Sequence, residues 1–311
     1  MVPLIVVLRP FAAITLEVLP FCYLRSASIS PVMRMDENFK ERARRAQGAM
    51  MTVADVLERV LPDINEHADS PAQWRALHAY GTIGKWVLAL KTIDDASQVG
   101  VAAAALRGSF EAYLDIILMK HFPEKVEDVA EWERSAILQA IEAAMTFYKG
   151  VGQPTPPEFE SGWQAFVAEH RDSVRLERVR RWPKGRDGKP RKPSEHPDRW
   201  TGNSLSKDVI IADRLEGGTS LRKIYEIDVR YAQWMIHGSG FHVSDRFAEE
   251  RYYELSAHLR RGVSALMLVA TQQMFEWLPG LDTPENRRLL SACYDRLAIL
   301  LDGEWRHAKH S

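Results

Sequence analysis

One long apolar stretch constrains the fold more than any other part of the chain. Residues 98–122, QVGVAAAALRGSFEAYLDIILMKHF, are apolar nearly all the way round a helix, which is typical of a helix at the centre of a fold. Arg107, Glu111 and Asp115 interrupt it at four-residue spacing and so share one side. Because buried charges are costly unless they are paired, two explanations stay open. Either Arg107 and Glu111 form an ion pair, or this side faces a polar site shared with another helix.

Helical patterns fill most of the remaining chain. No segment shows the alternation of Val, Ile and Thr that is typical of a strand. We therefore predict an all-α fold, a multi-helix bundle of roughly ten helices. Two of the expected starts carry capping signals: Thr52 with Asp55, and Thr283 before Pro284. The expected helices occupy residues 36–48, 52–61, 71–93, 98–122, 126–148, 158–181, 204–215, 219–237, 252–277 and 283–301.

The first 34 residues differ from the rest. Their apolar run is broken by three prolines and two charges: Pro3, Arg9, Pro10, Glu17 and Pro20. A membrane span needs about 20 apolar residues, and a central charge costs roughly 2.5–3.5 kcal/mol, so no stable membrane insertion is expected. We expect residues 1–34 to be an unstructured or spurious extension. Residues 35–311 are predicted to form a single helical domain with a basic loop inserted at 181–200.

The chain has only two cysteines, Cys22 and Cys293, far apart in sequence. They provide neither a disulfide framework nor zinc-ligand spacing, which is typical of a cytoplasmic protein. Motifs for metal or phosphate chemistry are also missing: the sequence has no His-Glu-x-x-His, no P-loop and no Gly-x-Ser-x-Gly. The spacing of Glu254 and His258 does not match the Glu-x-x-His pairs of di-iron bundles. No metal or other cofactor is therefore expected.

A basic segment follows the expected helix 158–181. Residues 171–199 carry a net charge of +6, although the whole chain carries −1. Proline and glycine are so frequent after Trp182 that a long mobile loop is expected. It is either a solvated surface or a track for the backbone of single-stranded RNA, with Trp182 or Trp200 stacking on a base. The residues that would contact the RNA backbone are Arg178, Arg180, Arg181, Lys184, Arg186, Lys189, Arg191 and Lys192.

The stretch 225–242, YEIDVRYAQWMIHGSGFH, is predicted to be an amphipathic helix that runs into a Gly-Ser-Gly turn. Arg230 and His237 are seven residues apart, so they lie two helical turns apart on one face. Together they could bind and cleave a phosphodiester. Alternatively, His237 caps its helix before Gly238. Ser239 and His242 are further ligand candidates, although each also fits an ordinary turn.

Three features in series resemble a known family. They are Arg107-x-x-x-Glu111 in an apolar helix, then Trp200-Thr-Gly-Asn-Ser, then a helix with Tyr225, Tyr231 and His237-Gly-Ser. Over roughly residues 72–273 this pattern resembles the bacterial proteins grouped as domain of unknown function 5677. The resemblance implies a helical bundle and assigns almost no chemistry.

A looser resemblance is to HEPN domains, small helical bundles of which many are metal-independent ribonucleases with an Arg-x4–6-His motif. Arg230-x6-His237 matches the long end of that spacing. A polar residue usually follows the arginine in HEPN proteins, whereas Tyr231 follows it here. The resemblance implies catalytic roles for Arg230 and His237. In a ribonuclease of this kind, Arg107 on the central helix would add positive charge at the site and Glu111 would orient it.

Three functions from different classes remain open. The first is a HEPN-like ribonuclease in a defence or toxin system, acting on single-stranded RNA. The second is a non-catalytic helical module that binds RNA or a protein partner through the basic loop, and a homo-oligomer is compatible with either. The third is a small-ligand pocket lined by Arg107, Glu111, Tyr231 and His237.

Overall fold

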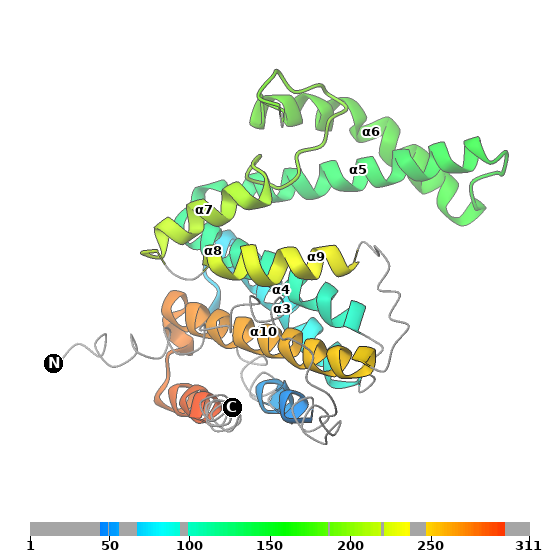
Figure 1. Cartoon of the computed structure of the whole chain (residues 1–311). Helices are drawn as coiled ribbons and strands as arrows, with labels where there is room; N and C mark the ends of the chain where they lie inside the picture. Colours follow the sequence, from blue (N-terminus) through cyan, green and yellow to red (C-terminus); the bar gives the residue numbers. More distant parts are fainter. Residues whose placement is uncertain are drawn as a thin grey trace. The chain divides into compact units, whose positions relative to one another are not determined.

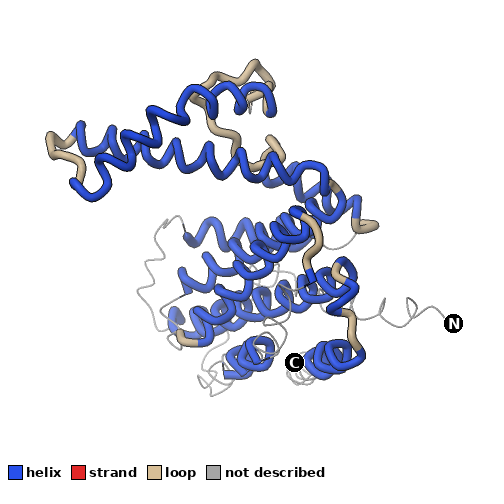
Figure 2. Tube along the Cα trace, turned by 180° about the vertical axis from the view of Figure 1, so that it is seen from behind, coloured by secondary structure: helices blue, strands red, loops and turns tan. Residues whose placement is uncertain are grey.

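The computed structural model describes residues 44–48, 50–55, 67–93, 99–185, 187–218, 221–236 and 247–295. The expected extension, residues 1–34, lies outside these ranges. The described residues are mostly helical and contain no strand beyond one isolated bridge between Lys184 and Pro190 (Figure 2). The all-α prediction is therefore confirmed. None of the described helices combines the length and apolarity needed to cross a membrane.

The chain forms two compact units. Unit 1 consists of the chain up to His121 together with the chain from Ala212 onward, and unit 2 consists of Phe122–Ile211. Unit 2 is therefore inserted between the two halves of unit 1 in the sequence. This division differs from the predicted single domain, in which only residues 181–200 were expected to be an insertion.

Helix α4 (Val99–His121) is the centre of unit 1, as its apolar composition predicted. Most of its residues are buried, and it packs against α3 (Pro71–Lys91), α9 (Arg230–Ile236) and α10 (Phe247–Trp277) (Figure 1). Small residues allow these close approaches. A Cβ atom on Gly108 would lie 2.5 Å from Trp86, and one on Gly262 would lie 2.7 Å from Leu106. Real Cβ contacts are longer, so a larger residue at either glycine would require the Trp86 or Leu106 side chain to move.

The starts of two helices in unit 1 follow from local sequence. Ser70 and Gln73 form a reciprocal capping box ahead of Pro71, the first residue of α3. Near the other end of the chain, the Thr283 hydroxyl accepts a hydrogen bond from the Asn286 amide at 3.1 Å. The helical residues 284–295 follow, so the predicted start at Thr283 and Pro284 is confirmed. A short 3₁₀ turn, η6 (Pro279–Leu281), connects α10 to this helix.

The C-terminal end of α3 is closed by a buried arginine of α10. Arg260 donates hydrogen bonds to the backbone carbonyls of Leu90 and Ile93, and also to the side chain of Gln47. The last carbonyls of a helix have no partner within the helix, so a guanidinium can satisfy several of them at once. Arg260 thereby links three helical segments of unit 1.

The segment that carries Arg230 is not one regular helix. It begins with α8 (Leu221–Ile224), passes through a π-helical turn η5 (Tyr225–Val229), and continues as α9. The Tyr225 ring stacks on Phe110 of α4 at 6.1 Å between centroids. Asp228 and Val229 of the π turn are buried. Such turns are rare and are frequent at functional sites.

Unit 2 is built on a helical hairpin. Helices α5 (Val126–Gly150) and α6 (Pro157–Arg181) run antiparallel, and the short turn η4 (Pro123–Lys125) precedes α5 (Figure 1). The apolar contact between the helices is small: Leu138, Val167 and Val174 are buried, with Ile141, Met145 and Phe166 partly buried around them. The chain then returns through an irregular loop, 182–204, to α7 (Leu205–Leu215).

Candidate functional site

Arg230 is the first residue of α9 and extends into solvent. Its guanidinium donates to the Glu226 carboxylate at 2.7 Å, and its side chain is 62% exposed. The hydrogen bond with Glu226 raises the pKa of Arg230, so the cation is maintained. Regular α-helix begins at this residue and extends to Ile236, so the predicted geometry of Arg230 and His237 stays a prediction. His237, Ser239 and His242 lie outside the described residues.

An aromatic pair follows Arg230 on α9. The Tyr231 and Trp234 rings lie 5.8 Å apart between centroids, and Trp234 is 45% exposed. Arg230 and Trp234 are four residues apart and so occupy the same helical face. A cation and an indole ring are therefore displayed together on this face.

Arg107 and Glu111 form the ion pair that the sequence suggested as the structural explanation. The Arg107 Nε donates to Glu111 Oε1 at 2.8 Å, and both side chains are about one-third exposed. The pair lies on α4, which packs directly against α9. The ion pair is therefore half-buried, and it lies on the helix that packs against the helix of Arg230.

A second polar pair was not predicted. The buried Asp228 carboxylate in the π turn interacts with His258 Nε2 of α10 at 2.9 Å. The two residues are thirty positions apart, so no local spacing indicates their pairing. Asp228 faces the interior whereas Arg230, two residues later, faces solvent, so the two residues belong to different faces of the segment.

The basic segment of unit 2 is not the open surface that the RNA interpretation required. Arg178 and Arg191 are buried. Arg178 donates to the Ser135 hydroxyl at 2.7 Å and to the Pro193 carbonyl at 2.8 Å. Arg191 donates to the carbonyls of Trp182 and Lys184, both at 2.8 Å. These two cations hold the loop together and are not available to a phosphate backbone.

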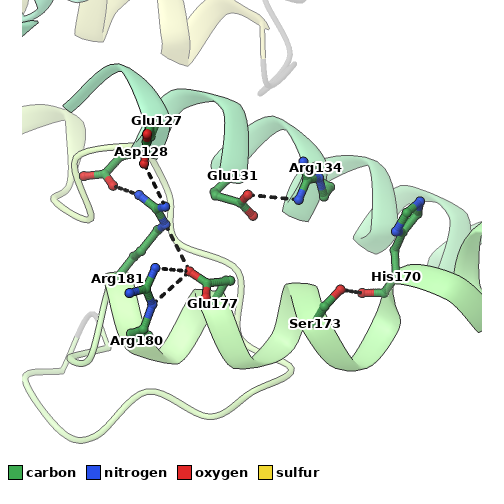
Figure 3. Close-up of polar contacts among 9 residues, drawn as sticks. All are labelled: Glu127, Asp128, Glu131, Arg134, His170, Ser173, Glu177, Arg180 and Arg181. Carbon is green, nitrogen blue, oxygen red and sulfur yellow. Dashed lines mark hydrogen bonds and ion pairs between the residues drawn. The ribbon is translucent and has the colours of Figure 1, made fainter. Parts of the chain in front are cut away.

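Arg181 and Arg180 are held by carboxylates. Arg181 donates to Asp128 at 2.6 Å and also interacts with Glu127 and Glu177, so it links α6 to the start of α5 (Figure 3). Arg180 pairs with Glu177 at 2.6 Å. The hydrogen bond donated by Arg180 lowers the pKa of Glu177, and the hydrogen bond that Arg181 donates to Asp128 raises the pKa of Arg181.

Trp182 and Trp200 are both buried, so the prediction that either stacks on a base is wrong. The Trp182 indole donates to the Trp200 carbonyl at 2.8 Å, which joins the two ends of the loop. Gly202 adopts a φ of 76°, and a Cβ there would lie 2.6 Å from the Trp182 ring. The Trp-Thr-Gly-Asn sequence is thus explained by packing.

A few cations of the segment remain exposed. Lys184, Lys189 and Lys192 extend into solvent with Arg180, and Lys189 pairs with Asp187 at 3.4 Å. Arg186 lies outside the described residues. The surface available to a phosphate backbone is therefore much smaller than the net charge suggested.

His196 belongs to the buried network of the loop. Its Nδ1 is hydrogen-bonded to the Ser135 hydroxyl at 2.7 Å, and the same hydroxyl accepts from Arg178. The Trp132 ring lies 5.5 Å from the imidazole between centroids. Burial, together with the charges of Arg178 and Arg191, lowers the pKa of His196 to about 4, although Asp198 opposes this shift.

This depressed pKa predicts that unit 2 loses stability in acid. An unfolded His196 takes up a proton below its ordinary pKa of 6.5, whereas the folded imidazole does so only near 4. The stabilisation is therefore complete above pH 6.5 and is lost as the pH falls from 6.5 to about 4. In urea unfolding, wild type should lose stability relative to His196→Gln across this window. The exposed His78→Gln control should follow wild type, and parallel pH profiles for wild type and His196→Gln would contradict the prediction.

Groups of three or more His, Cys, Asp or Glu side chains able to hold a metal ion do not occur among the described residues. Comparison with models of protein families, with curated proteins and with solved structures gave no match. The resemblances to domain of unknown function 5677 and to HEPN domains therefore stay predictions.

Proposed function

We propose that the protein is a metal-independent ribonuclease that acts on single-stranded RNA at the exposed face of α9. The observation that carries this proposal is the display of Arg230 and Trp234 on one face, 62% and 45% exposed. Proteins that bind single strands combine cations for the phosphates with aromatic rings on which bases stack. His237, three residues beyond Trp234, completes the same stripe by sequence spacing.

The proposed reaction is a transfer within the RNA. Arg230 binds the phosphate, and His237 takes the proton of the 2′-hydroxyl as general base. The 2′ oxygen then bonds to phosphorus, and the bond from phosphorus to the 5′ oxygen breaks. The leaving 5′ oxygen receives a proton, which yields a 2′,3′-cyclic phosphate and a 5′-hydroxyl. Arg107 adds positive charge where the transition state becomes more negative, and Glu111, at 2.8 Å, orients it.

Cleavage of single-stranded RNA in EDTA tests the proposal directly. We expect wild-type protein to cut the RNA and to leave ends that carry a 2′,3′-cyclic phosphate. Protein that binds RNA without cutting it would favour a non-catalytic module, and protein that does neither would contradict RNA as the ligand.

Trp234 provides a sharper test of where the RNA binds. Stacking of one base on an aromatic side chain is worth about 1–3 kcal/mol, so Trp234→Ala should raise the KM for RNA roughly 5- to 150-fold. Trp74 of α3 is a matched control, since it is 46% exposed and lies on a different helix. Trp74→Ala should leave the KM unchanged. Equal effects of the two substitutions would place the RNA elsewhere.

A further inference from the structure

The outer face of the second half of α5, together with the C-cap residue Val151, is apolar and largely exposed. Residues on this face follow a spacing of alternately three and four, as in the seam of a coiled coil. They are Ile137, Ala140, Ala144, Phe147 and Val151. Phe147 is 62% exposed, and Ile137 and Val151 are each about half exposed. The neighbouring positions on this face are Ala136, Ala143 and Tyr148, so the face carries no charge.

This face is separate from the contact between α5 and α6. The residues of α5 that meet α6 include Ser135, Leu138 and Glu142, which bond or pack with α6 side chains. At about 100° per residue, the exposed stripe lies roughly on the opposite side of α5. A soluble helix normally presents polar residues there, so a second apolar face indicates a second packing partner.

The first part of α5 shows how such a face becomes covered. Val129 is buried, and the Trp132 indole donates to the Pro197 carbonyl of the returning loop at 2.9 Å. His196 of the same loop bonds to Ser135, one turn further along the helix. Beyond Ser135 the outer face continues without cover from the described residues of unit 2, whose buried apolar core is small.

We propose that a second copy of this chain covers the face, with the two α5 helices packed antiparallel. The pattern is complementary to itself. An antiparallel partner can place its Phe147 over Ala144 and its Val151 over Ala140, while the same contacts repeat about the two-fold axis. Large side chains then meet small ones in these layers, and none of the four residues carries a charge.

The expected affinity of the dimer follows from the size of the apolar face. The stripe from Ile137 to Val151 is about 21 Å long at 1.5 Å per residue. One helical face of this length buries less than the roughly 800 Å² per partner of a standard interface. We therefore expect a dimer that forms at micromolar concentrations and dissociates on dilution.

Sedimentation velocity of the full chain at several micromolar concentrations tests the proposal. Wild type should shift from monomer to dimer as its concentration rises. Phe147→Lys and Ala140→Glu should both stay monomeric, and because both positions are exposed, circular dichroism should show unchanged helix content. Leu176→Lys is the matched control, since Leu176 is 70% exposed on α6 and lies away from the stripe.

The outcomes separate cleanly. A concentration-dependent dimer lost in Phe147→Lys and Ala140→Glu, but kept in Leu176→Lys, supports the proposal. A wild-type chain that stays monomeric overturns it. A dimer that persists in both stripe variants, or that Leu176→Lys also abolishes, overturns it as well, because the contact then lies elsewhere.

Discussion

A His237→Gln variant should cleave single-stranded RNA 10²- to 10⁴-fold more slowly than wild type, because a general base typically contributes that much and glutamine cannot accept the proton. The variant should stay folded, since an imidazolium at a helix end is worth only about 0.3–1 kcal/mol. The measurement is the cleavage rate in EDTA, with thermal unfolding as the check on folding. A folded variant that cuts as fast as wild type would remove His237 from the reaction.

Arg230 allows a second test of the same pair. Arg230→Lys keeps the charge but loses the planar, bidentate donor of the guanidinium, so cleavage should also be strongly impaired. Arg287→Lys is the matched control, because Arg287 is likewise exposed and paired with a carboxylate, that of Asp282. Equal activities of these two variants would show that Arg230 is an ordinary surface residue.

Asp208→Ala should lower the free energy of unfolding of unit 2 by about 3–5 kcal/mol, the usual cost of removing one partner of a buried ion pair. The Asp208 carboxylate is fully buried and accepts from Arg199 at 2.7 Å, Thr201 at 2.7 Å and Asn203 at 2.9 Å. Alanine would leave the Arg199 cation buried without this carboxylate. Urea unfolding followed by circular dichroism, with hydrogen exchange of the loop amides, measures the loss.

The control for Asp208, which lies on α7, is an aspartate of the preceding loop. Asp187 forms an exposed ion pair with Lys189, so Asp187→Ala should change the free energy of unfolding by less than about 1 kcal/mol. If Asp208→Ala were as mild as Asp187→Ala, the buried network would contribute nothing to the stability of unit 2.

The helices and their order could be predicted because their signals are local. The all-apolar composition of residues 98–122 predicted a central helix, and α4 is the helix that contacts α3, α9 and α10. Thr283 caps its helix as expected. Thr52 does not, since its hydroxyl donates to the Gly48 carbonyl four residues earlier, inside a helical segment. A threonine hydroxyl can accept a hydrogen bond at the start of a helix or donate one to the carbonyl four residues earlier. The sequence alone does not distinguish these two arrangements.

The net charge of the basic segment predicted too large a phosphate-binding surface, because all of its cations were assumed to be exposed. Proline has no N–H, so a Pro-rich loop has more carbonyls than backbone donors. Arginine offers five donors and can supply this deficit from the interior, as Arg178 and Arg191 do. The pairing of Asp228 with His258 could not be predicted for another reason. The two residues are thirty positions apart in sequence, and only the packing of their helical segments brings them together.

The position of unit 2 within the sequence has a consequence for synthesis on the ribosome. At about 5–20 residues per second, α9 and α10 emerge many seconds after α4, because the whole of unit 2 is translated between them. The apolar sides of α4 that α9 and α10 later cover must remain protected during that interval. The insertion therefore imposes a waiting period on the nascent chain, because α4 is complete long before the helices that cover it are synthesised.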